Sequence, residues 1–308
     1  MPTTVRYHRH CIDGIVCAAL IRRAMPEVIR AVPYAHVPRG EEPEHIEDAV
    51  GVDIPYLPGM VRWYDHHASG FQFLSRGSVT HPVRADIHFD PSALCCAELL
   101  PRPTAFDALV HEVMLNDSGR FATVDVAHDL SNPVTLATRT VNRILDSAVD
   151  LEIIERLART TGDPIAALLD AVPARERDIT LEVTHGHEAL IRREAQWTGP
   201  ILHFDLTAYG NDTDAISPFR PYLHFPDAPC FVALLETTQR VYVRLSSNPW
   251  RPWRGKSGPL RLDLIATELG GGGHPGVAGI TFPVTDVGRA AGRHAYEVAI
   301  HRLAALHG

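Results

Sequence analysis

The sequence predicts an α/β fold in two domains, for three reasons. Its 308 residues exceed the roughly 150 residues of a typical domain. Over residues 3–67, short β-branched stretches alternate with helix-length stretches, which predicts a mostly parallel sheet with flanking helices. A second alternation of strands and helices begins near residue 199. We therefore expect an N-terminal domain over 1–180 with a helical subregion, a connecting helix over 181–198 and a smaller α/β domain over 199–308.

Strand-like stretches dominate the start of the chain. Residue composition predicts strands at 3–8, 28–37, 49–57 and 60–67. Helical apolar spacing between the first two strands predicts a helix over 14–26, ended by Pro26.

Helical patterns follow from Asp90 to about residue 195. The Asp90-Pro91 pair that opens 90–100 is a helix-start signal. Helical spacing continues over 104–115, 132–148, 150–162 and 163–195.

The last part of the chain returns to an α/β pattern. Strands are expected at 199–206, 229–237 and 240–247, and helices at 260–270 and 286–308. The glycine run Gly270–Gly273 lies directly after the first of these helices.

Composition excludes several classes of protein. With 29 Lys and Arg against 37 Asp and Glu, the formal net charge is −8, so no general basic field exists to hold long duplex nucleic acid. No run of about 18 apolar residues occurs, and "MPTTVRYHRH" lacks a signal-peptide pattern. We therefore expect a cytoplasmic protein that binds no membrane. The five cysteines follow neither zinc-finger nor disulfide spacing, and Cys95 and Cys96 are interpreted as structural.

Carboxylates and imidazoles gather at the ends of predicted strands. His8, Asp53 and the run Asp65-His66-His67 each fall at the carboxyl end of such a strand, where ligands of parallel sheets bind. Further donors stand at Asp13 and Asp117. Hard oxygen and imidazole donors favour Mn²⁺ or Mg²⁺ over a thiolate zinc site. A pair of such ions activates water and neutralises a phosphoester, so the pattern predicts phosphoester hydrolysis.

Five stretches, in order, resemble the DHH phosphoesterases, which carry a C-terminal DHH-associated substrate domain. They are "YHRHCIDGIVCAAL", "GVDIPY", "WYDHHASG", "NDSGRF" and "ELGGGGHPGVAGITF", spread over residues 7–282. The resemblance implies a cofactor of one or two Mn²⁺ ions, with Mg²⁺ as an alternative. It implies metal ligands at His8, Asp13, Asp53, His66 and Asp117, with Asp53 bridging.

By the same resemblance, two residues of the run at 65–67 act beside the metal. Asp65 is expected to orient the histidines, and His67 to face the scissile phosphate as a hydrogen-bond donor or general acid.

One departure concerns the first stretch. Many family members carry Asp-x-Asp where this chain has Cys11-Ile12-Asp13. Cys11 can ligate a metal as thiolate, leave one metal weakly held, or pack against the sheet. His10 stays open as an alternative ligand to His8.

The substrate is expected to meet the glycine run. Glycines let backbone amides approach a phosphate, so Gly271, Gly272, Gly273 and His274 are expected to bind substrate. The alternative is a purely structural role, in which the glycines form a helix C-cap and a linker.

The predicted strand at 240–247 also departs from the family. Relatives place arginine where Ser246 stands, whereas here the arginine is Arg244. Both residues share one strand face and are candidate substrate ligands. The loop "SNPWRPWRGKSG" offers Trp250, Trp253, Arg251, Arg254 and Lys256 for base stacking or phosphate contact, or is an exposed loop.

The sequence thus predicts a metal-dependent phosphoesterase acting on short nucleotides: oligonucleotides, dinucleotides or a nucleotide bisphosphate. Two alternatives remain open. One is a single-strand exonuclease acting on longer strands, and the other is a catalytically silent nucleotide-binding or scaffold protein. A homodimer is compatible with either function.

Overall fold

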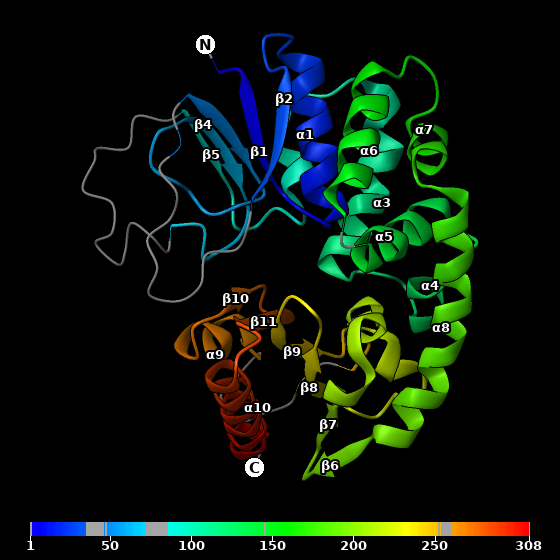
Figure 1. Cartoon of the computed structure of the whole chain (residues 1–308), viewed down its shortest axis with the longest axis vertical. Coiled ribbons are helices and arrows are strands. Elements are labelled where there is room, and N and C mark those ends of the chain that lie inside the picture. Colours follow the sequence, from blue (N-terminus) through cyan, green and yellow to red (C-terminus); the bar gives the residue numbers. More distant parts are fainter. Residues whose placement is uncertain are drawn as a thin grey trace. The chain divides into compact units, whose positions relative to one another are not determined.

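The computed structural model describes residues 2–34, 46, 48–71, 86–144, 146–251, 253 and 260–307. The chain divides into two compact units. The first unit comprises Met1–Arg120 and Asp129–Thr180, and the second comprises Phe121–His128 and Leu181–Gly308. The predicted fold class is confirmed, because each unit has a sheet with helices packed on it and the first sheet is parallel (Figure 1).

The sheet of the first unit has five parallel strands in the order β2-β1-β3-β4-β5. These are β1 (Thr4–His8), β2 (Arg30–Tyr34), β3 (Ala49–Val52), β4 (Met60–Asp65) and β5 (Asp86–Phe89). The predicted strands at 3–8, 28–37, 49–57 and 60–67 are confirmed in shorter form, although residues 35–37 lie outside the described part. β5 was not predicted, because its first three residues are exposed and give no apolar pattern.

Helices cover this sheet and form the rest of the first unit. They are α1 (Ile12–Ala24), η1 (Cys96–Leu99), η2 (Thr104–Phe106), α3 (Asp107–Ser118), α5 (Pro133–Arg143), α6 (Ser147–Arg159) and α7 (Pro164–Ala171). The side chains of Asn132, Asp146 and Asp163 cap α5, α6 and α7 by accepting backbone N–H groups of their first turns, which explains why these helices were predictable. The longer α8 (Ala174–Glu194) runs from the first unit into the second.

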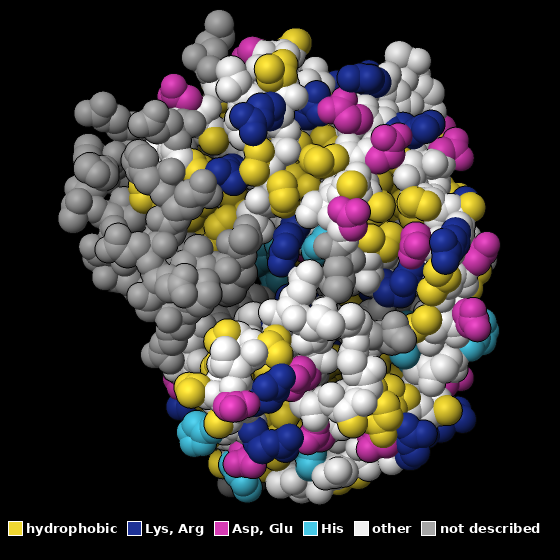
Figure 2. Space-filling view, viewed as in Figure 1, with side chains coloured by type: hydrophobic (Ala, Val, Ile, Leu, Met, Phe, Trp, Pro, Cys, Tyr) yellow, Lys and Arg dark blue, Asp and Glu magenta, His cyan; other side chains and the backbone are white. Residues whose placement is uncertain are grey.

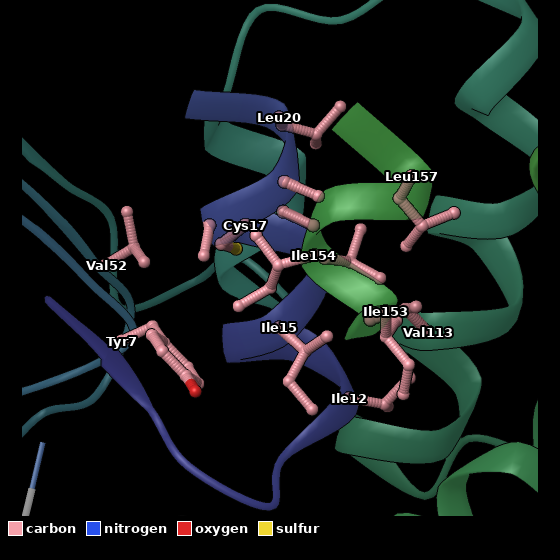
Figure 3. Close-up of a cluster of buried hydrophobic side chains, with 14 of the residues drawn as sticks. Tyr7, Ile12, Ile15, Cys17, Leu20, Val52, Val113, Ile153, Ile154 and Leu157 are labelled. Atoms are coloured by element: carbon pink, nitrogen blue, oxygen red, sulfur yellow. The ribbon is translucent and has the colours of Figure 1, made fainter. Parts of the chain in front are cut away.

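The main core of the first unit lies between the sheet and α1. Ile12 and Ile15 of α1 lie beside Ile153 and Ile154 of α6, while Tyr7 reaches the same cluster from β1 (Figure 3). These side chains are almost fully buried. Because α1 follows β1 directly, its packing fixes the loop that joins them.

The opposite face of the sheet carries a second, aromatic core. Trp63 of β4 belongs to it, whereas the next residue, Tyr64, belongs to the main core, as the two-residue period of a strand requires. The Trp63 ring stacks on Phe89 and meets Phe71 edge-on. Its Nε1 donates to the carbonyl oxygen of Ile54 at 2.7 Å, which ties β4 to the residues after β3.

The expected helix over 90–100 is wrong. Only the short 3-10 helix η1 forms there. The side chain of Asp90 accepts from the backbone and hydroxyl of Ser92, forming a local turn instead of a helix start. The backbone N–H groups of Cys96 and Ala97 bind a distant carboxylate, so the segment is shaped by that contact.

The second unit has a mixed sheet in the order β10-β11-β9-β8-β7-β6. Its strands are β6 (Gln196–Thr198), β7 (Ile201–Asp205), β8 (Cys230–Glu236), β9 (Val241–Ser247), β10 (Gly272–Gly273) and β11 (Val277–Phe282). Its helices are α4 (Val124–Ala127), η3 (Thr207–Ala215), η4 (Arg220–Leu223), α9 (Leu262–Glu268) and α10 (Asp286–His307). Of the helices in the described ranges, none has both the length and the apolar character to cross a membrane.

Candidate metal centre

Three neighbouring strands of the first sheet deliver polar residues to one edge. His8 is the last residue of β1, Asp65 is the last residue of β4, and Asp53 directly follows β3, which lies between them. Carboxyl ends of parallel strands meet at the same edge. Asp53 adopts a left-handed backbone with φ 56°, an uncommon conformation for a residue other than glycine.

Asp53 lies between two groups of imidazoles. Its Oδ2 is 3.2 Å from Nδ1 of His8. Its Oδ1 is 3.5 Å from Nε2 of His66 and 3.6 Å from Nδ1 of His67. The residue is 2% exposed, and within the described ranges Oδ1 accepts no hydrogen bond. The carboxylate of Asp53 therefore faces candidate metal ligands on both of its oxygens.

Two further carboxylates approach His66 from helices. Asp13 in the first turn of α1 and Asp117 in the last turn of α3 place their Oδ2 atoms 3.7 Å and 3.4 Å from Nε2 of His66. Potential ligand atoms of Asp13, His66 and Asp117 lie within 4.8 Å of one another. The structure thus brings together all five residues that the resemblance implied as metal ligands.

The orientation of His66 is set by a backbone carbonyl. Its Nδ1 lies 3.2 Å from the carbonyl oxygen of Ala93, so Nδ1 carries the proton and donates it. Nε2 is then the ring nitrogen that faces the carboxylates, and it would bind a cation once its proton has left. The sequence carried no signal for Ala93, because a carbonyl can come from any residue.

Asp65 orients His67 through the ring and His66 only through the backbone. Asp65 Oδ1 accepts from Nδ1 of His67 at 2.8 Å. The same oxygen accepts the backbone N–H groups of His66 at 2.9 Å and His67 at 3.2 Å. Asp65 thus contacts the ring of His67, while the ring of His66 contacts the carbonyl oxygen of Ala93.

Asp13 is held by a cradle that the sequence did not reveal. Its Oδ2 accepts the backbone N–H of Cys96 at 2.6 Å, and its Oδ1 accepts that of Ala97 at 3.0 Å. The thiol of Cys17, one helical turn later, donates to Oδ1 at 3.5 Å. A buried carboxylate needs such donors, so Asp13 is fixed in place before any ion binds.

His10 and Cys11 separate in the loop between β1 and α1. His10 turns toward Asp150 of α6, which accepts its backbone N–H at 3.0 Å and lies 3.6 Å from its Nδ1. Cys11 instead offers its thiol within 4.8 Å of ligand atoms of His8 and Asp53. Between the two histidines, the structure groups His8 with the other metal-binding candidates.

Crowding of acidic groups shifts their protonation. Burial and the charge of Asp53 raise the pKa of Asp13 to about 6, while burial and the charge of Asp13 raise the pKa of Asp117 to about 8. Burial lowers the pKa of His66, but its contact with Asp53 and the charges of Asp117 and Asp13 raise it to about 11. The site binds protons tightly, because it concentrates negative charge in a buried place.

Asp53 and Cys11 shift in opposite directions. Burial raises the pKa of Asp53, but the contact with His66 and the hydrogen bond with His8 outweigh burial and hold that pKa well below its usual value. Burial and the charge of Asp53 raise the pKa of the Cys11 thiol. The bridging candidate is thus ionised, and the thiol is protonated when nothing else binds there.

The substrate-binding candidates lie in the second unit. Gly272 and Gly273 form β10, and Gly271 donates its N–H to Ala266 O at 2.7 Å. A Cβ on Gly271 would lie 2.0 Å from Gly279 O, so only glycine fits. His274 N donates to Val277 O at 2.8 Å. The glycine run is therefore an ordered strand and turn.

Arg244 and Ser246 occupy different environments on β9. Arg244 of β9 lies opposite Gly279 of β11, and Gly279 lies opposite Gly272 of β10. Arg244 therefore shares a row of the sheet with the glycine run. Its guanidinium also donates to Ile216 O. Ser246 is fully buried and donates to Pro218 O at 2.8 Å.

The tryptophan-containing loop is partly integrated into the second unit. Trp250 Nε1 donates to Phe121 O at 2.9 Å, and its ring meets Phe219 edge-on. Arg251 pairs with Asp227. Arg254 and Lys256 lie outside the described residues. For Trp250, these contacts favour a packing role over the base stacking considered from the sequence.

The sequence matches no family model and no curated protein. Solved structures share its fold. PggH, a pGpG-specific phosphodiesterase from Vibrio cholerae, aligns over 99% of this chain and 100% of its own, with a TM-score of 0.55 and 16% identity. The DHH domain of a member of a ribosomal protein family aligns over 100% and 87%, with a TM-score of 0.58 and 14% identity. The chain has the DHH fold.

A third solved structure with a similar fold, RecJ from Thermus thermophilus in complex with Mn²⁺, aligns over 97% of this chain and 52% of its own, with a TM-score of 0.53 and 16% identity. In this chain, the DHH fold gathers carboxylates and imidazoles around Asp53. Its Oδ1 is buried without a hydrogen bond from the described residues, and the donors are hard oxygens and imidazoles. The residues therefore fit a divalent cation such as Mn²⁺ or Mg²⁺.

Proposed function

We propose that this protein is a metal-dependent phosphoesterase that hydrolyses phosphoester bonds of short nucleotides. The observation that carries the proposal is the placement of Asp53, whose Oδ2 faces His8 while its Oδ1 faces His66. A carboxylate shared by two donor sets is the requirement of a two-metal centre, in which the ions lie about 3.5–4 Å apart.

The residues divide into two groups of ligands. Asp13, His66 and Asp117 would hold one cation together with Asp53 Oδ1, and His8 would hold the other with Asp53 Oδ2. We propose Mn²⁺ as the ion, with Mg²⁺ as the alternative. When bound, the ions supply Lewis acidity toward phosphoryl oxygens and lower the pKa of water.

His67 is proposed to donate to the phosphoryl group. Asp65 holds its Nδ1–H at 2.8 Å, so the opposite ring nitrogen, Nε2, is the one left to meet substrate. The His67 side chain keeps 19% of its surface exposed, whereas His66 keeps 1%. Burial lowers the pKa of His67, but the charge of Asp65 raises it to about 9, so in the cation-free chain the ring is protonated near neutral pH and can donate.

Short nucleotides are the proposed substrates. The net charge of −8 opposes tight binding of long polyanions. On the coloured part of the face in Figure 2, acidic and basic side chains are interspersed. Gly271–His274, with Arg244 in the same sheet row, would bind substrate phosphate or base. PggH, which shares the fold, is a pGpG-specific phosphodiesterase, and this likeness supports a small nucleotide substrate.

The setting is proposed to be the cytoplasm. All five cysteines are free, which fits a reducing compartment.

A substrate panel tests the proposal. The purified chain with Mn²⁺ is given dinucleotides, a nucleotide bisphosphate, and single strands of about 20 nucleotides, longer than one ordinary binding site. Turnover of the short substrates alone is expected. Turnover of the long strands with salt-sensitive binding would select the exonuclease alternative, and nucleotide binding without turnover at any Mn²⁺ concentration would select the silent one.

Asp53→Asn supplies the matched test of the centre. The variant keeps the shape of the side chain and removes its charge, so activity and Mn²⁺ binding should both be lost while the fold remains. Asp170→Asn, at an exposed position, serves as the control and should retain both. Full activity in the Asp53 variant would remove this residue from the mechanism.

A further inference from the structure

We propose that Cys11 is a metal ligand that makes the His8–Cys11–Asp53 site prefer a softer divalent cation, such as Zn²⁺ or Co²⁺, than the Asp13–His66–Asp117 site. The inference deepens the proposed function, since it concerns the cation preference of the same centre. The two ions would therefore differ in kind.

Cys11 differs from the other cysteines of the chain. Cys17, Cys95 and Cys96 belong to the apolar core of the first unit, and Cys230 belongs to that of the second. Cys11 is only partly buried. It directly precedes α1 with an extended backbone, and its side chain makes no hydrogen bond that caps the helix. Its thiol therefore lies outside both apolar cores.

The thiol lies beside two other candidate cation ligands. One ligand atom from each of His8, Cys11 and Asp53 lies within 4.8 Å of the other two. Asp53 is 2% exposed, and its Oδ2 is 3.2 Å from Nδ1 of His8. A sulfur, a nitrogen and an oxygen thus surround one point, and the other oxygen of Asp53 points to the second donor set.

The donor chemistry of the two sets differs. Thiolate with imidazole suits Zn²⁺ and similar borderline ions, whereas carboxylates with one imidazole suit Mn²⁺ and Mg²⁺. Asp13, His66 and Asp117 provide two carboxylates and one imidazole. The sulfur of Cys11 in the other set therefore shifts the cation preference of that set, while Asp53 remains the carboxylate that both sets share.

Cobalt reports sulfur ligation directly, because thiolate bound to Co²⁺ gives a charge-transfer absorption in the near ultraviolet. The full chain is titrated with Co²⁺ as wild type, Cys11→Ser, Cys11→Asp and, as a thiol-removing control, Cys230→Ala. The band should appear in the wild type and the control and be absent from both Cys11 variants. Equal bands in all four proteins, or no band while Co²⁺ is bound, would overturn the inference.

Competition between ions gives an independent readout. Equilibrium dialysis against mixtures of Zn²⁺ and Mn²⁺, followed by metal analysis, should show the Zn²⁺ preference of the wild type reduced about ten-fold or more in Cys11→Asp. An unchanged ratio contradicts the inference.

The inference and the proposed function can fail separately. A cobalt–thiolate band without hydrolysis under any metal leaves Cys11 as a ligand and removes the phosphoesterase. Hydrolysis with Mn²⁺ but no band keeps the enzyme and removes Cys11 from the centre.

Discussion

Cys96 donates its backbone N–H to Oδ2 of Asp13 at 2.6 Å, across 83 residues of sequence. The same short segment supplies the N–H of Ala97 to Asp13 and the carbonyl of Ala93 to His66. Residues 93–97 thus position two candidate ligands through the backbone alone. The positions of Asp13 and His66 therefore depend on the backbone path of this segment.

Cation affinity should rise with pH. Burial and the charge of Asp53 raise the pKa of Asp13 to about 6, burial and the charge of Asp13 raise that of Asp117 to about 8, and that of His66 is raised to about 11. Ligands must be deprotonated, so binding displaces protons. Mn²⁺ affinity should therefore increase between pH 6 and pH 8. Calorimetry in buffers of different ionisation enthalpy measures this proton release, and an affinity that is flat or falls over the range refutes it.

The cation-free protein should lose stability as pH rises. In the folded state Asp13 and Asp117 titrate at about 6 and about 8 instead of the ordinary value of 3.8. Between about pH 4 and 8 the folded chain therefore binds more protons than the unfolded chain, and its free energy of unfolding falls. The pKa of His66 is raised from 6.5 to about 11, so this residue also lowers the free energy of unfolding as the pH rises above about 6.5. Urea unfolding with a chelator present measures the trend, which excess Mn²⁺ should weaken.

Gly70→Ala should disable His67 through Asp65. An added Cβ would lie 2.5 Å from Asp65 Oδ2 and 3.0 Å from the Trp63 ring, both fully buried. Displacing Asp65 removes the acceptor that holds His67, so hydrolysis should fall roughly 10–100-fold, with about 1–3 kcal/mol of stability lost. Hydrolysis assays and urea unfolding measure both. In the control Gly162→Ala no heavy atom lies within 4 Å of the added Cβ, and equal behaviour of the two variants would contradict the contact.

Asp150→Ala should loosen the loop that leads into α1. Asp150 accepts the backbone N–H of His10, which holds a left-handed backbone with φ 55°. Removing the acceptor from a buried donor costs about 1–3 kcal/mol, so the midpoint of urea unfolding should fall. Asp150→Asn keeps an acceptor oxygen and should lose less. Equal losses would show that the charge of Asp150 matters more than this hydrogen bond.

Sequence patterns predicted those parts of the structure that depend on neighbours along the chain. β1, β3 and β4 have clear apolar patterns, and their polar ends fall at one edge because parallel strands share direction. The capped helices α5, α6 and α7 were found for the same local reason.

Contacts between distant segments explain what was missed. Residues 90–100 look helical locally, yet their amides bind Asp13. Whether His8 or His10 faces the other candidates depends on Asp150, far along the chain. The hydroxyl of Ser246 is engaged by Pro218 O, a partner that no periodicity reveals. Long-range hydrogen bonds override local preference at these places.

Residues Phe121–His128 belong to the second unit, although the residues on both sides of them belong to the first. This arrangement limits how the chain can be truncated for experiments. The anchors of these residues, Trp250 and Phe219, lie more than ninety positions downstream. A truncation ending at residue 180 would keep residues 121–128 but remove Trp250 and Phe219, which Phe121 contacts. Any fragment intended to fold alone should replace those eight residues with a short polar bridge, and half-molecule expression without this repair should yield aggregation-prone material.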